Sequence, residues 1–350
     1  VIPVGPPISN YKIVSEIRSE LAAKLNINKA QQVLAEKWAP YMSELGRILM
    51  DATCYESDMR FPTDIKLLWE TVEWNYRLLR SHCRVLRSAL PRTKFNKWAK
   101  RYASYSRSRR PSKKQKRSLT RGLIRLLGKI HPILSDMEKE HSINYTAERE
   151  KRRRATATIL RQQSQLFYKG ERPKGRIVSL DRPYIRPIVR GKEAKSVEFG
   201  AKVNKLQVDG ISFIEYLSFD AFNEGTRLRS TVYLAQGLFK TKTTILGADA
   251  IYATNKNRRF ITAQDIKTDF KRKGRKTKYH GQYRLLAAMI TKERATRLEG
   301  SFGTDKEHFL LKKIKARNKK TGTLWIFFGI HTSNALKIGQ RIQNQAQKAA

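Results

Sequence analysis

Two apolar runs in the sequence each end on an aspartate. The run 48–50 precedes Asp51, and the run 244–248 precedes Asp249. Short apolar runs bounded by polar residues are typical of buried strands, and open α/β sheets place their chemistry where loops leave the strand ends. We therefore interpret both aspartates as carboxylates delivered by strand ends. For Asp51 considered alone, the alternative is a side chain that caps its own strand-to-loop turn.

A third carboxylate, Glu299, lies between two cationic residues in a segment with helical periodicity. Lys292, Ala295, Glu299, Gly303 and Lys306 recur at i, i+3, i+4 and i+7 spacing, so they share one face of a regular helix. A glycine on such a face lets a phosphate backbone or a neighbouring strand approach closely. Considered alone, this face is also what an ordinary solvated helix presents, because exposed ion pairs are common and weak.

The charge of the chain points to a polyanionic partner. Its 73 Lys and Arg against 30 Asp and Glu give a formal net charge of +43, and a field of that sign concentrates polyanions near the surface. Nucleic acid is the first candidate partner and a membrane surface the second. No membrane-spanning helix is expected, since apolar runs such as 324–330 fall far short of the roughly 20 residues that cross a bilayer.

Cysteine use indicates the compartment. Cys54 and Cys83 follow no metal-ligand spacing and are too few for a disulfide framework. We therefore expect a reducing interior, either the cytoplasm or the nucleoid. The chain opens on Val1 without a signal pattern and without a Met, so we expect an upstream segment to be missing.

The first part of the chain is predicted to form helices around one strand. Two helices are expected between residues 10 and 38, followed by the strand that ends at Asp51. Thr63 is a plausible cap for a long helix that stops at Pro91, with Cys83 on its core face.

A basic segment follows. Between Glu73 and Asp136 the sequence has no acidic residue but 19 Lys or Arg, so this block is expected to bind phosphate. Residues 104–116 are predicted to form a mobile basic loop, before helices at 121–134 and 143–168. The cations expected to contact DNA in this block are Lys113, Lys114, Lys116 and Arg117.

Aromatic residues interleave with these charges. Phe95, Trp98 and Tyr102 suit stacking on bases or sugars. Their spacing equally fits one helix face packed in a core, and the sequence favours neither alternative.

The second half of the chain changes to strands. Strands are predicted at 176–180, 197–208 and 211–219, with the turn Asp209-Gly210 as a strong hairpin signal between the last two. A helix at 224–239, the strand that ends at Asp249, a basic loop at 271–278 and a helical region at 279–316 follow. The predicted organisation is a helical segment at 1–44, the first part of an α/β core at 45–63, an all-helical basic insertion at 64–170, and the remainder of the core at 171–350.

Several blocks together resemble a known family. Asp249-Ala250-Ile251-Tyr252 with Asn257, and Leu298-Glu299-Gly300-Ser301-Phe302-Gly303 with Lys306, resemble the second and third acidic motifs of DDE transposases of the IS4/IS5 and IS1182-like bacterial insertion sequences. The blocks at 51–64, 186–192 and 198–202 look like the same group. The resemblance covers nearly the whole chain, and its specificity comes from the agreement of separated blocks in order.

The resemblance implies an RNase H-like core, a mixed sheet flanked by helices, with a catalytic acid on the first strand, another after the fourth strand and a third on a late helix. Carried over, these acids are Asp51, Asp249 and Glu299. Clustered carboxylates repel one another and need a cation, and oxygen ligands without nearby His or Cys select Mg²⁺ or Mn²⁺. Two ions per active site would activate the attacking oxygen and stabilise the leaving one.

The chain departs from the family pattern at two positions. A tyrosine expected earlier on the helix that carries the glutamate is absent. The arginine usually found four residues before the glutamate is missing, because Ala295 stands there with Arg294 and Arg297 to either side. Lys292 is expected to reach the same phosphate instead. Asp181, in a Pro turn after a weak strand, is the alternative first acid. The cations expected to contact DNA around the core are Lys306, Lys292, Arg297, Arg186, Arg190 and Lys192.

The sequence therefore predicts a DNA transposase that cleaves phosphodiesters at transposon ends and transfers the strand into target DNA. The expected partners are double-stranded DNA, in the form of terminal inverted repeats and target DNA, and a second copy of the chain in a homodimer; the expected location is the bacterial cytoplasm, in the nucleoid. The alternative is a nonenzymatic basic DNA- or RNA-binding protein derived from a decayed or domesticated transposase.

Overall fold

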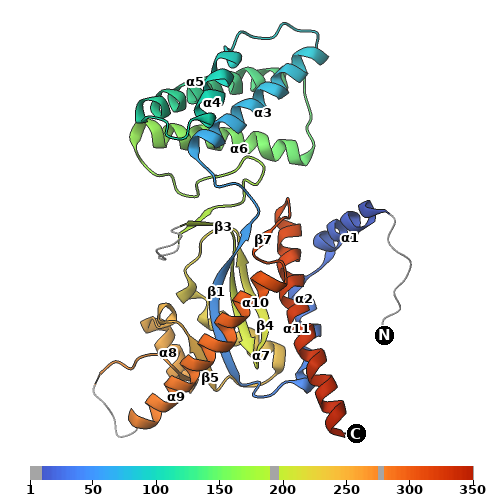
Figure 1. Ribbon diagram of the computed structural model, residues 1–350, viewed down its shortest axis with the longest axis vertical. Helices are drawn as coiled ribbons and strands as arrows, with labels where there is room; N and C mark the ends of the chain where they lie inside the picture. The colour runs from blue at the N-terminus through green and yellow to red at the C-terminus, as the bar shows by residue number, and fades with distance from the viewer. Residues whose placement is uncertain (1–9, 190–196, 275–279, 350) are drawn as a thin grey trace. The chain divides into compact units, whose positions relative to one another are not determined.

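The computed structural model describes residues 10–189, 197–274 and 280–349. The chain divides into two compact units (Figure 1). Val1–Asp58 and Ile188–Ala350 form the sheet unit, and Met59–Pro187 form the helical unit. The predicted insertion at 64–170 lies within the helical unit.

Seven strands of the described chain form one mixed sheet in the sheet unit. The strand order is β2-β3-β1-β5-β6, with β4 beside β3 and β7 beside β1. β3 runs antiparallel to both β1 and β4, whereas β5 runs parallel to β1 and to β6. The strands are β1 (Arg47–Ser57), β2 (Pro187–Val189), β3 (Val197–Val208), β4 (Ile211–Ser218), β5 (Ile245–Ala248), β6 (Lys267–Thr268) and β7 (Lys313–Ile314).

The predicted hairpin between β3 and β4 is confirmed. Asp209 and Gly210 connect the strands with φ angles of 46° and 78°, as a type I′ turn requires. Asp209 also anchors neighbouring segments, because its carboxylate accepts hydrogen bonds from the Ser43 N–H at 2.9 Å and from Arg341 at 2.8 Å.

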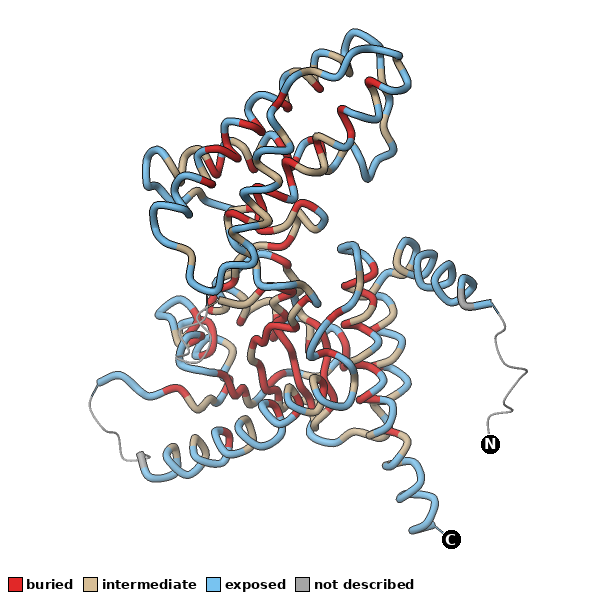
Figure 2. Tube along the Cα trace, turned by 45° about the horizontal axis from the view of Figure 1, so that its top comes forward, coloured by how far each residue is buried: buried red, intermediate tan, exposed pale blue. Residues whose placement is uncertain are grey.

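Helices flank the sheet on both faces because β1 alternates its side chains. Ile48 and Met50 pack into a cluster with Val232, whereas Leu49 packs on the opposite side with Ile290 and Leu298. Figure 2 shows the buried residues concentrated along the strands and the outer helix faces exposed. The helices are α1 (Tyr11–Lys24), α2 (Ile27–Trp38), α7 (Leu228–Phe239), α8 (Asn255–Ala263), α9 (His280–Glu293), α10 (Gly300–His308) and α11 (Lys319–Ala349), with short helical turns η1 (Ala39–Tyr41), η3 (Glu224–Thr226), η4 (Ala250–Tyr252) and η5 (Arg294–Glu299).

Two buried amides occupy backbone groups of β4 that face away from β3. Gln31 of α2 accepts from the Ile214 N–H at 2.6 Å and donates to the Ile214 carbonyl at 3.1 Å. Asn334 of α11 makes the same pair of bonds with Ser212, at 2.9 and 2.6 Å. Unpaired strand edges invite pairing with other chains, so these amides close the edge without another strand.

β1 is longer than the sequence predicts. It continues to Ser57 and does not end at Asp51, because β3 pairs with it from Ile48 to Glu56 and buries Tyr55 completely. The sequence signal was wrong here because polar letters after Asp51 were taken to end the core, although alternate side chains of the strand remain buried.

Residues 176–180 form no strand, contrary to prediction. Ile177 and Leu180 pack in a cluster with Leu67 and Ile159 of the helical unit. The Ile177 N–H donates to the side-chain oxygen of Gln162 at 2.9 Å, so side-chain and packing contacts replace a strand partner.

Four α-helices make up most of the described helical unit. Thr63 caps the first as predicted, since its hydroxyl accepts from the Lys66 N–H at 3.3 Å. The predicted loop at 104–116 is mostly helical, because Ser112 and Gln115 form a capping box that starts a helix at Lys113. The helices are α3 (Asp64–Val85), α4 (Phe95–Arg107), α5 (Lys113–Glu140) and α6 (Ala147–Ser164), followed by the π-helical turn η2 (Gln165–Lys169).

The aromatic residues of α4 contribute to the core of the helical unit. The Phe95 ring stacks on Tyr76 with centroids 3.8 Å apart, and Tyr102 stacks on Trp69 at 4.7 Å. Cys83 is buried in the same cluster, as predicted. For Phe95 and Tyr102 the core alternative is therefore the one observed.

Candidate active site

Asp51 and Asp249 occupy matching positions on two parallel strands. Met50 of β1 pairs with Ala248, the last residue of β5. Each aspartate follows directly, so the two carboxylates lie at the level where β5 ends. β1 gains its next partner on that edge only at Glu56, which pairs with β7. Asp51 is therefore mid-strand, yet it stands where the short neighbouring strand stops.

Asp51 lies close enough to Asp249 for the charge of one carboxylate to affect the pKa of the other. The pKa of Asp51 is raised to about 6. Burial is the largest cause, the Ala52 N–H lowers the pKa, the carboxylates of Glu224 and Asp249 raise it, and Arg294 lowers it. The Ala52 N–H donates to Asp51 at 2.8 Å. Glu224, at the start of η3, pairs with Lys202 at 2.6 Å. A buried carboxyl beside like charges retains its proton to unusually high pH.

The raised pKa of Asp51 has a consequence for stability. Between the pKa of the unfolded chain, near 3.8, and the folded value, about 6, the folded state binds more protons, so stability falls as pH rises through this window. Asp51→Asn is therefore expected to increase the free energy of unfolding at pH 8 by on the order of 2 kcal/mol, with little change at pH 3.5. Thermal melts at both pH values check this; an equal effect at both would contradict it.

Arg294 lies against these acids and was not singled out by the sequence as a site residue. Its Nη1 is 3.7 Å from an Asp249 oxygen, and its Nε is 3.8 Å from Asp269. The Arg294 side chain is 16% exposed, whereas that of Asp249 is 57% exposed. Asp269 in turn accepts from the Ala248 N–H at 3.2 Å. The end of β5 therefore carries a largely buried cation, Arg294, and its partner Asp249 is exposed to solvent.

The backbone around Arg294 explains its position. Residues Arg294–Glu299 form a π-helical turn, η5, in which bonds connect residues five apart instead of four. Arg294 therefore has the place relative to Glu299 that Ala295 would have in a regular helix. For the same reason, the shared face predicted for Lys292, Glu299 and Lys306 does not extend across this turn to Lys292.

The structure does not bring Glu299 into the same electrostatic group. Glu299 is exposed at the junction of η5 and α10, and the carboxylates that raise the pKa of Asp51 are Glu224 and Asp249. In the described part of the chain, no group of three or more His, Cys, Asp or Glu side chains is placed to hold a metal ion. The observed arrangement is an aspartate pair with Glu224 nearby.

The other predicted DNA contacts are distributed over both units. Arg297 pairs with Glu293 at 3.1 Å and with Asp209 at 3.6 Å. Lys292 is exposed and Lys306 is partly exposed. In the helical unit, Arg186 donates to the Pro183 carbonyl, and Lys113, Lys114, Lys116 and Arg117 are exposed on the first turns of α5. Arg190 and Lys192 lie outside the described residues.

Asp181, the alternative first acid, belongs to the helical unit. Its side chain is 71% exposed and pairs with Arg152 at 3.2 Å. Asp51 differs from it by its burial in the sheet and by its register with the second aspartate.

A buried lysine beside Asp51 was missed by the sequence reasoning. Lys205 of β3 pairs in register with Asp51 and is fully buried. Its Nζ donates to Asp305 at 2.7 Å and to Ser301 at 3.0 Å, and the Tyr55 hydroxyl donates to Asp305 at 2.7 Å. Asp305 and Ser301 belong to α10, so this network fastens α10 to the sheet. The available signal was a lysine inside a buried strand.

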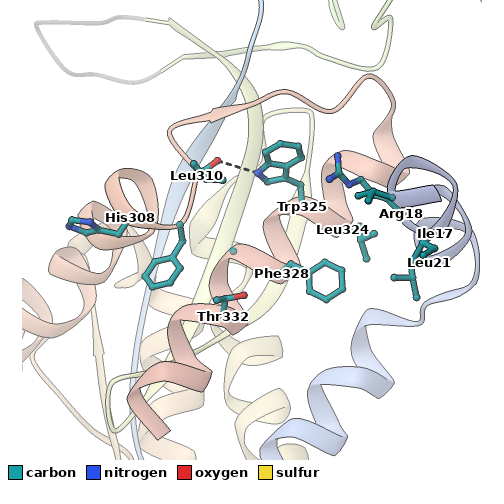
Figure 3. Close-up of a pocket in the computed structure, with 12 residues that line it drawn as sticks. Ile17, Arg18, Leu21, His308, Leu310, Leu324, Trp325, Phe328 and Thr332 are labelled. Atoms are coloured by element: carbon teal, nitrogen blue, oxygen red, sulfur yellow. Dashed lines mark hydrogen bonds between the residues drawn. The ribbon is translucent and has the colours of Figure 1, made fainter. Parts of the chain in front are cut away.

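A separate hollow of about 610 Å³ lies between α1 and α11 in the sheet unit. Figure 3 shows Leu21, Phe328 and Trp325 around it; Trp325 donates to the Leu310 carbonyl at 3.1 Å, and Arg18 lies over the Trp325 ring. Its described lining is mostly apolar and contains no carboxylate. The aspartate pair is therefore separate from this hollow.

Comparison of the chain with protein-family models, with curated proteins and with solved structures finds no match. Among the described helices, none is both long and apolar enough to cross a membrane.

Proposed function

We propose that the chain is a DNA transposase of the DDE type, which cleaves phosphodiesters at transposon ends and joins the freed strand to target DNA. The observation that carries this proposal is the register of β1 with β5, which puts Asp51 and Asp249 at equivalent strand positions. Taking the longer strands β1, β3, β4 and β5 in order, the second aspartate follows the fourth, as expected for an RNase H-like core. That fold is part of the proposal.

The residues at this site fit a hard divalent cation in their chemistry. Asp51, Asp249 and Glu224 offer only oxygen donors, which suit Mg²⁺ or Mn²⁺. The pKa of Asp51 is raised chiefly by burial, and repulsion from Glu224 and Asp249 adds to this; a bound cation would relieve that repulsion. When bound, a pair of such ions supplies Lewis-acid activation of the attacking oxygen and of the leaving one. Asp51 and Asp249 would hold the ions, and Glu299, which lies outside this group in the structure, would complete the set only after moving toward them.

Among the described residues, Arg294 is a cation that lies beside the aspartate pair, and we assign to it the binding of a phosphate oxygen there. Its Nη1 lies 3.7 Å from an Asp249 oxygen, and its Nε lies 3.8 Å from an Asp269 oxygen without forming a hydrogen bond. Guanidinium groups bind phosphates through paired N–H donors. In the proposal Arg294 takes the role of the arginine missing at Ala295, while the helical unit holds DNA through its exposed cations. A homodimer on two transposon ends, in the bacterial nucleoid, belongs to the same proposal.

The second candidate function is DNA or RNA binding without catalysis. The exposure of Glu299 and its separation from the acids around Asp51 favour it. Both candidates require salt-sensitive binding, because Lys and Arg release counterions from nucleic acid.

Nicking of supercoiled plasmid carrying candidate transposon ends separates the two candidates. We expect the wild-type protein to nick this DNA with Mg²⁺ or Mn²⁺ and to stop when EDTA is added, with binding to the plasmid retained in both cases. Binding without any metal-dependent nicking would overturn the catalytic proposal and leave the second candidate.

A further inference from the structure

A groove of about 580 Å³ lies within the helical unit, among α3, α4, α5 and η2. Its volume is in the range of small-ligand sites, and the groove is open to solvent. Three cations from α5 and two aromatic residues are among its lining residues. The residues that the argument uses are Lys113, Lys116, Arg117, Tyr105 and Phe167.

The cations of the groove have no described acidic partner. Lys113, Lys116 and Arg117 are exposed and form no ion pair with a described carboxylate. The one acid in the lining, Asp64, is already engaged, because it accepts from Gln163 at 2.9 Å and pairs with Arg176 at 3.5 Å. The groove therefore presents uncompensated positive charge to an anion.

The aromatic residues give the groove a face that a phosphate alone does not need. Tyr105 of α4 and Phe167 of η2 are partly exposed and line the groove. Both also pack against the core cluster of the helical unit, as Phe95 and Tyr102 do, but each remains partly exposed in the groove. Aromatic faces beside cations are the combination that binds unpaired nucleotides, since every base has a face that stacks.

We propose that this groove holds an unpaired nucleotide of bound DNA, with the base against Tyr105 and Phe167 and its phosphate at Lys113, Lys116 and Arg117. A duplex with a single-stranded end therefore binds more tightly than a blunt duplex of the same length. This inference rests on the DNA binding in the proposed function, but not on cleavage at Asp51.

Fluorescence anisotropy with blunt and overhanging duplexes tests the groove, using full-length protein and 2-aminopurine in the overhang. Wild type is expected to favour the overhang on the order of tenfold, with quenching of the 2-aminopurine fluorescence. Tyr105→Leu with Phe167→Leu should bring the ratio close to one while blunt-end affinity is kept, whereas Tyr105→Phe should preserve the ratio. Phe167→Leu alone, which retains an apolar side chain, provides the same test if the double variant does not fold.

Two lysine substitutions on α5 distinguish a general loss of positive charge from a loss of binding in the groove. Lys114 is as exposed as its neighbours but does not line the groove. Lys116→Ala should lower overhang affinity more than blunt affinity, and Lys114→Ala should lower both equally. Equal wild-type affinity for the two duplexes, or a preference unchanged by loss of both rings, would overturn the inference. Nicking assayed in parallel distinguishes this failure from failure of the catalytic proposal, since the preference does not need Asp51.

Discussion

Asp51→Asn and Asp249→Asn are each expected to reduce metal-dependent nicking by about a thousandfold or more. Each removes one carboxylate of the pair that the register of β1 and β5 brings together. Cation-assisted displacement at phosphorus supplies several kcal/mol of charge stabilisation, and about 4 kcal/mol corresponds to a thousandfold. DNA affinity should stay within about twofold at fixed salt, because the binding charges lie elsewhere. Initial nicking rates and anisotropy on the same preparations check both statements.

Asp220→Asn is the matched control. Asp220 is exposed after β4, and its carboxylate accepts from the next N–H, that of Ala221, at 2.8 Å, just as Asp51 accepts from Ala52. The same charge is lost and the same local hydrogen bond is altered, so nicking should be retained. Full activity in Asp51→Asn would remove it from the site and make Asp181 the first acid. Since Asp51→Asn is expected to be more stable than wild type at neutral pH, lost activity would not reflect unfolding.

Lys205→Met is expected to lower the free energy of unfolding of the sheet unit by about 3–5 kcal/mol. The substitution leaves Asp305 buried without its cation, and an uncompensated buried charge has a cost of this size. Lys205 is fully buried and Asp305 is 2% exposed. Thermal and denaturant unfolding of the full chain measure the effect.

Two further variants separate the buried charge from packing. Lys205→Met combined with Asp305→Leu should recover most of the loss, because replacing both members of a buried pair by apolar groups is often neutral. Lys313→Met removes a lysine that pairs with Glu56 and is 49% exposed, so it should change stability by less than about 1 kcal/mol. If Lys205→Met unfolds like the wild type, the network does not fasten α10 to the sheet.

Local signals in the sequence predicted much of the sheet unit. The Asp209-Gly210 turn determined the β3–β4 hairpin, and the apolar run before Asp249 located β5. These features depend on neighbouring residues, so composition and spacing reveal them. Pairing along a whole strand depends on distant partners, and for this reason the extension of β1 past Asp51 and the absence of a strand at 176–180 were not predicted.

The candidate site was predictable only in part for the same reason. Apolar runs that end on an aspartate pointed to Asp51 and Asp249, but the influence of Glu224 comes from tertiary placement. Arg294 was hidden by a backbone irregularity that has no spacing signature. Lys205 was not predicted because a lysine in a strand is ordinarily exposed. Its burial is stabilised by Asp305 on α10, a partner that is distant in the sequence. Helix α11, beyond the predicted helical region, likewise became clear only through its contacts with β4.

The π-helical turn at Arg294–Glu299 affects how this chain should be compared with others. Because of the extra residue, side chains before the turn and side chains after it do not share the helix face that a fixed-spacing motif assumes. An ungapped alignment places Ala295 opposite the arginine of the family motif and suggests that its function is lost. An alignment that allows one extra residue places Arg294 opposite that arginine. Searches for relatives should therefore permit a one-residue insertion at this point, because the π-helical turn accommodates one extra residue.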